Sequence, residues 1–157
     1  MDKDINPLQA GIDAPDFALR DQERAEFKLS DFIGKRVLVS FHPVAWTTLC
    51  NQQMQDLEEN KALLDSLNTV AIAISVDSVP SKYSWANAIG IKETRLLSDF
   101  WPHGKVASLF GVFREKDGIA QKSNFIIDEN GKVVFSKLYE TSDVPDIEEI
   151  ISVLKGL

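Results

Sequence analysis

A strand–helix–strand pattern in the first half of the chain constrains the fold more than any other feature. Residues Arg36 to Phe41 and Val70 to Val76 form two apolar runs, each as long as a typical strand. Runs of this kind are typical of strands that are covered on both faces of a sheet. Residues Asn51 to Leu67, between them, carry apolar side chains at helical spacing, which predicts a helix with one buried face. This order predicts a right-handed βαβ unit with two parallel strands.

The rest of the chain adds short elements to this unit. Further strands are expected over residues 95–98, 121–127 and 132–137, and shorter ones near residues 14–19 and 26–29. Further helices are expected over residues 80–88, 105–110 and 145–154. Asn130-Gly131 predicts a tight hairpin turn between the last two strands. The order βαβ…ββα with additional N-terminal elements fits the thioredoxin fold, and residues 1–157 are expected to form a single domain.

The only cysteine of the chain, Cys50, lies where the strand Arg36 to Phe41 gives way to the following helix. The N–H groups in the first turn of a helix lack partners within the helix, and the helix dipole favours negative charge there. This placement favours a thiolate, which is the nucleophilic form of cysteine. The alternative for a lone cysteine is a buried structural side chain.

The spacing around this cysteine is more specific than the cysteine itself. Pro43, Thr47 and Cys50 form the pattern P-x-x-x-T-x-x-C, which is the signature of the peroxiredoxins. Thr47, one helical turn before the sulfur, can direct a hydroxyl at it and at a bound peroxide. Pro43 has no N–H group, so it can cover the sulfur without offering a competing donor. The pattern favours redox chemistry at Cys50 over a structural role.

From about Gly11 to Leu138 the chain resembles the AhpC/TSA peroxiredoxins, and most closely their one-cysteine AhpE-type group. The segments 96–104 (LLSDFWPHG), 111–113 (GVF), 118–120 (GIA) and 125–128 (FIID) carry the likeness to that group. The resemblance implies an α/β structure: a thioredoxin fold with an N-terminal peroxiredoxin extension and a central mixed sheet flanked by helices. It implies a thiol-dependent peroxidase in which Cys50 attacks hydrogen peroxide or an organic hydroperoxide and becomes a sulfenic acid. It also implies a homodimer that packs through loops near the active site.

The chain departs from the family at two supporting positions. The family usually has an arginine where this chain has Lys122, and a glutamate where it has Gln53. In the family this glutamate bonds the arginine, which faces the thiolate. Lysine keeps the positive charge but loses the planar fork, and glutamine keeps hydrogen bonding but loses the negative charge. Both neutral drift and a retuned site explain the pair, and Lys122 is the cation that matches the family's position.

Two side chains near the cysteine, His42 and Trp46, each have two possible roles. His42 either faces the pocket and bonds the sulfenic acid, or ends its strand with a bond to the backbone. The His-Pro pair at this position resembles a second, longer one-cysteine class of the family. Trp46 either lines the rim of the site or serves as a core or dimer contact, as do Trp101 and His103.

Composition and cysteine count restrict partners and compartment. The net charge of −7 and the absence of a basic run argue against nucleic acid or an anionic membrane as a partner. No metal site or other cofactor is expected, since two distant histidines and one cysteine make no ligand pattern. Residues Met1 to Asn6 contain no apolar signal segment, so a cytoplasmic location is expected. A single cysteine implies an external thiol reductant: thioredoxin, a glutaredoxin-like protein or a small thiol.

Two other functions compete with a peroxidase. A thiol–disulfide oxidoreductase would need a second cysteine at C-x-x-C spacing, and that position is Gln53. A thioredoxin-fold binding or holdase module without peroxidase turnover is the second alternative, and the changes at Lys122 and Gln53 are its support. The intact Pro43, Thr47 and Cys50 favour the enzyme.

Overall fold

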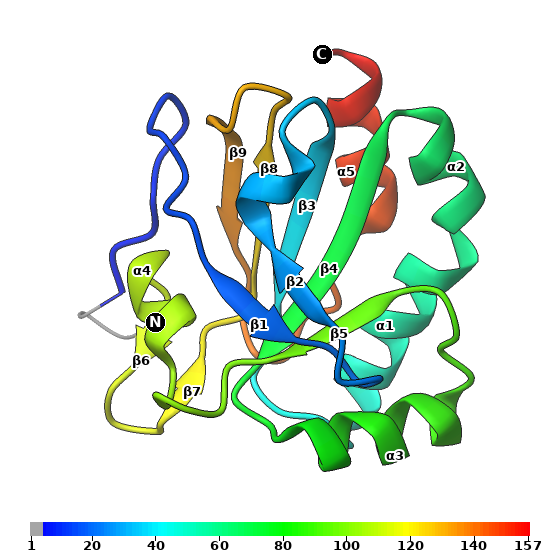
Figure 1. Ribbon diagram of the computed structural model, residues 1–157, viewed down its shortest axis with the longest axis vertical. Helices are drawn as coiled ribbons and strands as arrows, with labels where there is room; N and C mark the ends of the chain where they lie inside the picture. Colours follow the sequence, from blue (N-terminus) through cyan, green and yellow to red (C-terminus); the bar gives the residue numbers. More distant parts are fainter. Residues whose placement is uncertain (1–4) are drawn as a thin grey trace.

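The structure, a computed structural model, describes residues 5–157 and is built around a mixed sheet of seven strands (Figure 1). The strands of this sheet are β1 (Ala18–Arg20), β2 (Glu26–Lys28), β3 (Arg36–Phe41), β4 (Thr69–Ser75), β5 (Arg95–Ser98), β8 (Ser123–Ile127) and β9 (Val133–Leu138). Their order across the sheet is β2-β1-β5-β4-β3-β8-β9. β6 (Phe113–Arg114) and β7 (Ile119–Ala120) form a separate two-stranded ribbon.

The predicted βαβ unit lies at the centre of this sheet. β3 pairs with β4 in parallel, and β4 pairs with β5 in parallel, whereas β8 runs antiparallel to β3. The N-terminal strands extend one edge and β9 forms the other. The sequence prediction of a thioredoxin fold with a central mixed sheet and an N-terminal extension is confirmed.

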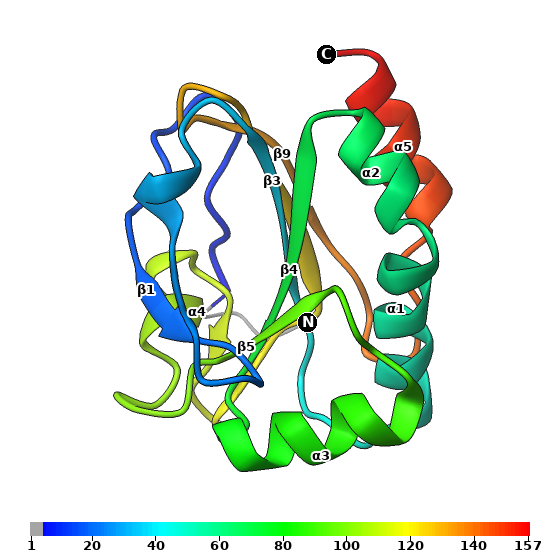
Figure 2. The same cartoon turned by 45° about the vertical axis from the view of Figure 1, so that its right-hand side comes forward.

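Helices cover the two faces of the sheet unequally. The helices are α1 (Thr48–Glu59), α2 (Lys61–Ser66), α3 (Val79–Ile89), α4 (Lys105–Leu109) and α5 (Ile147–Lys155), with a short 3-10 helix, η1 (Leu29–Phe32). Figure 2 shows α1, α2 and α5 on one face, with α4 on the opposite side and α3 at one end. The sheet therefore has a buried core on each face, as alternate side chains along β3 require.

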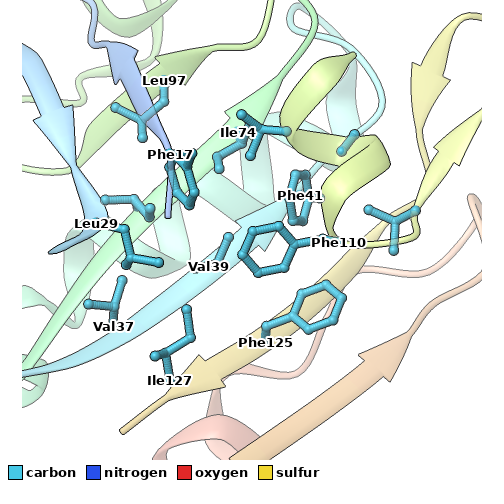
Figure 3. Close-up of a cluster of buried hydrophobic side chains, with 14 of the residues drawn as sticks. Phe17, Leu29, Val37, Val39, Phe41, Ile74, Leu97, Phe110, Phe125 and Ile127 are labelled. Carbon is cyan, nitrogen blue, oxygen red and sulfur yellow. The ribbon is translucent and has the colours of Figure 1, made fainter. Parts of the chain in front are cut away.

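Each core takes every second residue of β3. Val37, Val39 and Phe41 point into the core shown in Figure 3, together with Phe110 and Phe125. The other core holds Leu38 together with apolar side chains of the helices, among them Cys50, Met54, Leu57, Leu64, Trp85, Ile150 and Leu154. By this alternation Ser40 and the residue after β3, His42, belong to the same face as Cys50.

The prediction of one continuous helix over residues 51–67 is wrong, because the structure has two helices there. α1 begins at Thr48 and ends at Glu59, and α2 begins at Lys61. The break lies at Asn60, whose side-chain Nδ2 donates to the carbonyl of Asp56 at 2.8 Å. Asparagine side chains of this kind compete with the backbone ladder of a helix. The apolar periodicity continues across the break, which is why the sequence pattern does not reveal it.

The C-terminal hairpin has the predicted turn, but its first strand is shorter. Gly131 has a φ of 83°, and Asp128 Oδ1 accepts hydrogen bonds from the backbone N–H groups of Asn130 and Lys132. β8 begins at Ser123 rather than at residue 121. The N–H group of Tyr139 still donates to the carbonyl of Lys122 at 2.9 Å, so Lys122 directly precedes the strand.

Within residues 5–157 no helix is both long and apolar enough to cross a membrane. In the same part of the chain, no three side chains of the His, Cys, Asp or Glu type gather as potential metal ligands. The predicted absence of a signal segment concerns Met1 to Asn6, of which residues 1–4 lie outside the described residues.

Candidate active site

Cys50 lies in the first turn of α1, where the chain passes from the sheet into the helix. β3 ends at Phe41, α1 begins at Thr48, and Cys50 is 3% exposed. Its position next to the free N–H groups of the first turn favours negative charge on the sulfur. The fold therefore places the predicted nucleophile in the first turn of a helix, as the sequence indicated.

The loop between β3 and α1, residues 42–47, is held by contacts from the connection between β4 and α3 and from the first turn of α3. Trp46 has a φ of 71°, which is the left-handed region that a bulky side chain rarely adopts. Next to it, the N–H group of Ala45 donates to Asp77 Oδ2 at 2.8 Å, and Trp46 Nε1 donates to Ser81 Oγ at 3.3 Å. Strained backbone of this kind persists where tertiary contacts over-determine it, and it clusters at functional sites.

Pro43 and Thr47 differ in exposure. Pro43 is buried, whereas Thr47 is exposed and precedes α1 as its N-cap residue. The hydroxyl of Thr47 makes only a long contact of 3.5 Å with the carbonyl of Val44. It can turn to a ligand at little cost, because the bond that it would give up is weak. An exposed hydroxyl thus lies one helical turn from a buried sulfur.

His42 is completely buried and bonds a lysine. Its Nε2 lies 2.9 Å from Nζ of Lys82, and its ring centroid is 5.3 Å from that of Trp85. Its Nδ1 is buried without a hydrogen-bond partner in the described part of the chain. The side chain therefore does not make the bond to the backbone that one interpretation of the sequence expected.

Lys82 is the member of this cluster that the sequence analysis missed. It lies in α3, its exposed fraction is 0%, and its Nζ lies 5.6 Å from the ring centroid of Trp85. The buried face of α3 consists of Lys82, Trp85 and Ala86, which follow one another at helical spacing. This spacing is the signal that could have identified Lys82 as a buried lysine.

Gln53 and Lys122 are both buried, but each bonds other partners. Gln53 Nε2 donates to Ser40 Oγ at 2.7 Å. Nζ of Lys122 donates to the carbonyls of Thr141 and Asp143 at 3.1 and 2.5 Å. The side-chain bond that joins the corresponding pair in the family is thus replaced in this chain by two separate sets of contacts.

Buried positive charges and the sulfur influence one another electrostatically. Burial lowers the pKa of Lys82 to about 7, while the negative charges of Asp77 and Cys50 act in the opposite direction. Burial also lowers the pKa of Lys122, and the negative charges of Cys50 and Asp143 act in the opposite direction. The pKa of His42 lies well below its ordinary value because of burial and of both lysines, so its imidazole is neutral at neutral pH. A negative charge on Cys50 thus acts on two buried lysines, Lys82 and Lys122, and both lysines act on the neutral His42.

Comparison with known proteins gives a consistent picture. The model of the AhpC/TSA family matches residues 10–136. Alkyl hydroperoxide reductase E of Mycobacterium tuberculosis is 38% identical over 140 residues, which cover 88% of this chain and 91% of that protein. Peroxiredoxin Bcp of Escherichia coli is also 38% identical, over 152 residues that cover 91% of this chain and 94% of that protein.

Solved structures agree with these relatives. The crystal structure of Enterococcus faecalis AhpC superposes with a TM-score of 0.86 at 27% identity, covering 94% of this chain and 90% of that one. The structure of peroxidoxin BcpB of Mycobacterium tuberculosis has a TM-score of 0.84 at 24% identity, covering 96% and 98%, and supports the fold alone. The resemblance predicted from the sequence is confirmed by these matches.

Proposed function

This chain belongs to the AhpC/TSA family and is a peroxiredoxin, and we propose that it works by a one-cysteine mechanism with Cys50 as its peroxidatic residue. The observation that carries the proposal is that the single cysteine of the chain lies in the first turn of α1, within the P-x-x-x-T-x-x-C pattern. The substrates are hydrogen peroxide and organic hydroperoxides.

The first half of the cycle oxidises the sulfur. The thiolate of Cys50 attacks one peroxide oxygen, an S–O bond forms, and the O–O bond breaks. Cys50 becomes a sulfenic acid, and the peroxide is reduced by two electrons to hydroxide or alkoxide, which takes up a proton to give water or an alcohol. The hydroxyl of Thr47 is the group proposed to orient the peroxide, and buried Pro43 shields the sulfur without donating a hydrogen bond.

The second half restores the thiol with an external reductant. A thiol attacks the sulfenic acid, releasing water and leaving a mixed disulfide on Cys50. A second thiol equivalent attacks this disulfide, frees the Cys50 thiol and leaves as the oxidised reductant. Thioredoxin, a glutaredoxin-like protein or a small thiol fits this role, because Cys50 has no second cysteine in the chain to resolve it.

The test is the reaction of Cys50 with stoichiometric peroxide. Wild-type protein is expected to gain one oxygen atom by mass spectrometry, and then to turn over peroxide when each candidate reductant is supplied. Cys50→Ser should fold and consume none, because the substitution removes the nucleophile and little else. Residual peroxide consumption by the folded serine variant would contradict the proposal, and a fast Cys50–Cys50 disulfide between chains would contradict the one-cysteine route.

A homodimer is proposed as the working assembly, supported by apolar side chains around the start of α3. Trp46 and Tyr83 are about half exposed, Phe100 is similar, and Trp101 is 82% exposed. Trp46 contacts α3 through Ser81, and Phe100 and Trp101 line a hollow with the first residues of α3. Exposed apolar surface of this kind favours association. Sedimentation of wild type and of Trp101→Glu tests it, the variant being expected to shift towards monomer.

Two predictions from the sequence remain to be tested. The extent of the domain, residues 1–157, can be checked by limited proteolysis, which should leave one resistant core. The cytoplasmic location can be checked by fractionation of cells that express the protein. A membrane-bound or exported pool would contradict the second prediction.

A further inference from the structure

A buried lysine without a carboxylate partner requires a physical explanation. Lys82 has an exposed fraction of 0%, and within residues 5–157 no carboxylate lies within ion-pair distance of its Nζ. Its contacts are the Nε2 atom of His42 at 2.9 Å and the face of Trp85. A buried charge with so little compensation costs stability, and such groups are kept mostly where they serve a site.

The way α1 lies along β3 places His42, the partner of Lys82, beside the sulfur of Cys50. Gln53 of α1 bonds Ser40 of β3 at 2.7 Å, which fixes one point of contact between helix and strand. His42 lies two residues further along the strand on the same face, about 6.6 Å away at the rise of a strand. Cys50 lies three residues back along the helix, about 4.5 Å away on the same face. Since the helix runs back along the strand, both steps lead in the same direction and bring His42 alongside Cys50.

The bond between Lys82 and His42 determines which imidazole nitrogen carries the proton. An ammonium group only donates, so His42 Nε2 must accept from the charged lysine. The proton of the neutral ring then lies on Nδ1. This nitrogen is buried and has no hydrogen-bond partner among the described residues, so its N–H group is free to donate to a further acceptor.

We infer that Lys82 is a positioning residue of the peroxidase site: it places a second positive charge beside Cys50 and holds His42 in the tautomer whose Nδ1–H can bond the oxidised or ionised sulfur. This inference rests on the proposed function, since it assigns a role around the same nucleophile. It also explains why the site tolerates a lysine at position 122, whose ammonium is engaged by two backbone carbonyls.

The charged groups around Lys82 come from three other parts of the fold. Asp77 follows β4, and its Oδ2 accepts hydrogen bonds from the N–H of Ala45 and from Ser75 Oγ. Cys50 belongs to α1, and its negative charge favours the ammonium form of Lys82, as does that of Asp77. Lys122 precedes β8 and, like Lys82, keeps His42 neutral. At and below neutral pH, where Lys82 holds its proton, the ammonium group and a negative charge on Cys50 attract each other.

The functional test compares Lys82→Met with wild type in the reaction with stoichiometric peroxide, followed by stopped flow across pH. Methionine keeps the unbranched shape of the side chain, is shorter by one atom, and removes the charge. The rate constant is expected to fall by about tenfold at pH 7, with the pH profile displaced to higher pH and the two rates converging where both proteins carry a thiolate. Lys61→Met, which removes an exposed lysine of α2, is the matched control and should react as wild type does.

A second measurement needs no variant. Nitrogen-15 NMR of the histidines in reduced wild-type protein at pH 6, where Lys82 keeps its proton, is expected to show the proton of His42 on Nδ1. A proton on Nε2, or a Lys82→Met protein with the wild-type rate and pH profile, would overturn the inference while leaving the proposed peroxidase intact. If wild-type Cys50 itself fails to react with peroxide, the proposed function fails, and the role of Lys82 in that reaction fails with it.

Discussion

The substitution Lys82→Met is expected to stabilise the protein at low pH. The pKa of Lys82 is lowered from 10.5 to about 7 in the fold, a difference that corresponds to about 5 kcal/mol of destabilisation when the lysine is charged. Against this, methionine leaves Nε2 of His42 without its donor, which costs about 1 to 3 kcal/mol. The free energy of unfolding of the variant should therefore exceed that of wild type by about 2 to 4 kcal/mol below pH 7.

The pH dependence follows from the proton count. Between pH 7 and pH 10.5 the unfolded chain keeps the proton on Lys82 while the folded protein has lost it. Stability rises with pH wherever the unfolded state binds more protons, so this lysine makes wild type more stable as the pH increases through that window. The variant lacks this contribution. Its advantage should shrink towards pH 10, where the missing bond to His42 makes it the less stable protein.

The assay is urea denaturation at pH 6 and pH 9, with all proteins in the Cys50→Ser background. That background removes the cysteine, whose charge acts on Lys82. Lys61→Met serves as the control for loss of an exposed lysine, with an expected change within about 0.5 kcal/mol. A Lys82→Met protein that is less stable than its parent at pH 6, or whose difference from it is the same at both pH values, would refute the reasoning.

Three further substitutions test Lys122, Thr47 and Gln53. Lys122→Met should lower the free energy of unfolding by about 3 kcal/mol in urea denaturation, because it removes two hydrogen bonds from the ammonium group. It should also slow the oxidation of Cys50. Lost stability with an unchanged oxidation rate would make Lys122 purely structural. Thr47→Val should lower that stopped-flow rate about tenfold or more with little change in stability, and an unchanged rate would exclude the hydroxyl. Gln53→Glu should destabilise the protein at pH 7 and regain stability in acid, where the buried carboxyl is protonated; equal urea midpoints at both pH values would count against this.

Much of the fold can be predicted from local patterns in the sequence. The two apolar runs that became β3 and β4, and the Asn-Gly turn before β9, each depend on a few neighbouring residues. The break at Asn60 escapes prediction, because the apolar spacing continues on either side of it and the side-chain bond from Asn60 to Asp56 leaves no mark in that spacing. The start of β8 lies two residues later than predicted. Pairing with β9, and not the composition of residues 121–127, decides where this strand begins.

The sequence by itself determined the family and predicted the nucleophile, because Pro43, Thr47 and Cys50 lie within one short stretch of the chain. Only the tertiary structure decided what surrounds the sulfur. The spacing of Lys82 with Trp85 and Ala86 marks one face of α3, but a lysine is expected to face water because burying its charge is costly. The packing of α3 beside the end of β3 is what buries this one. The electrostatic surroundings of Cys50 are set by residues that are distant in sequence, so they depend on the packing of the whole sheet and its helices.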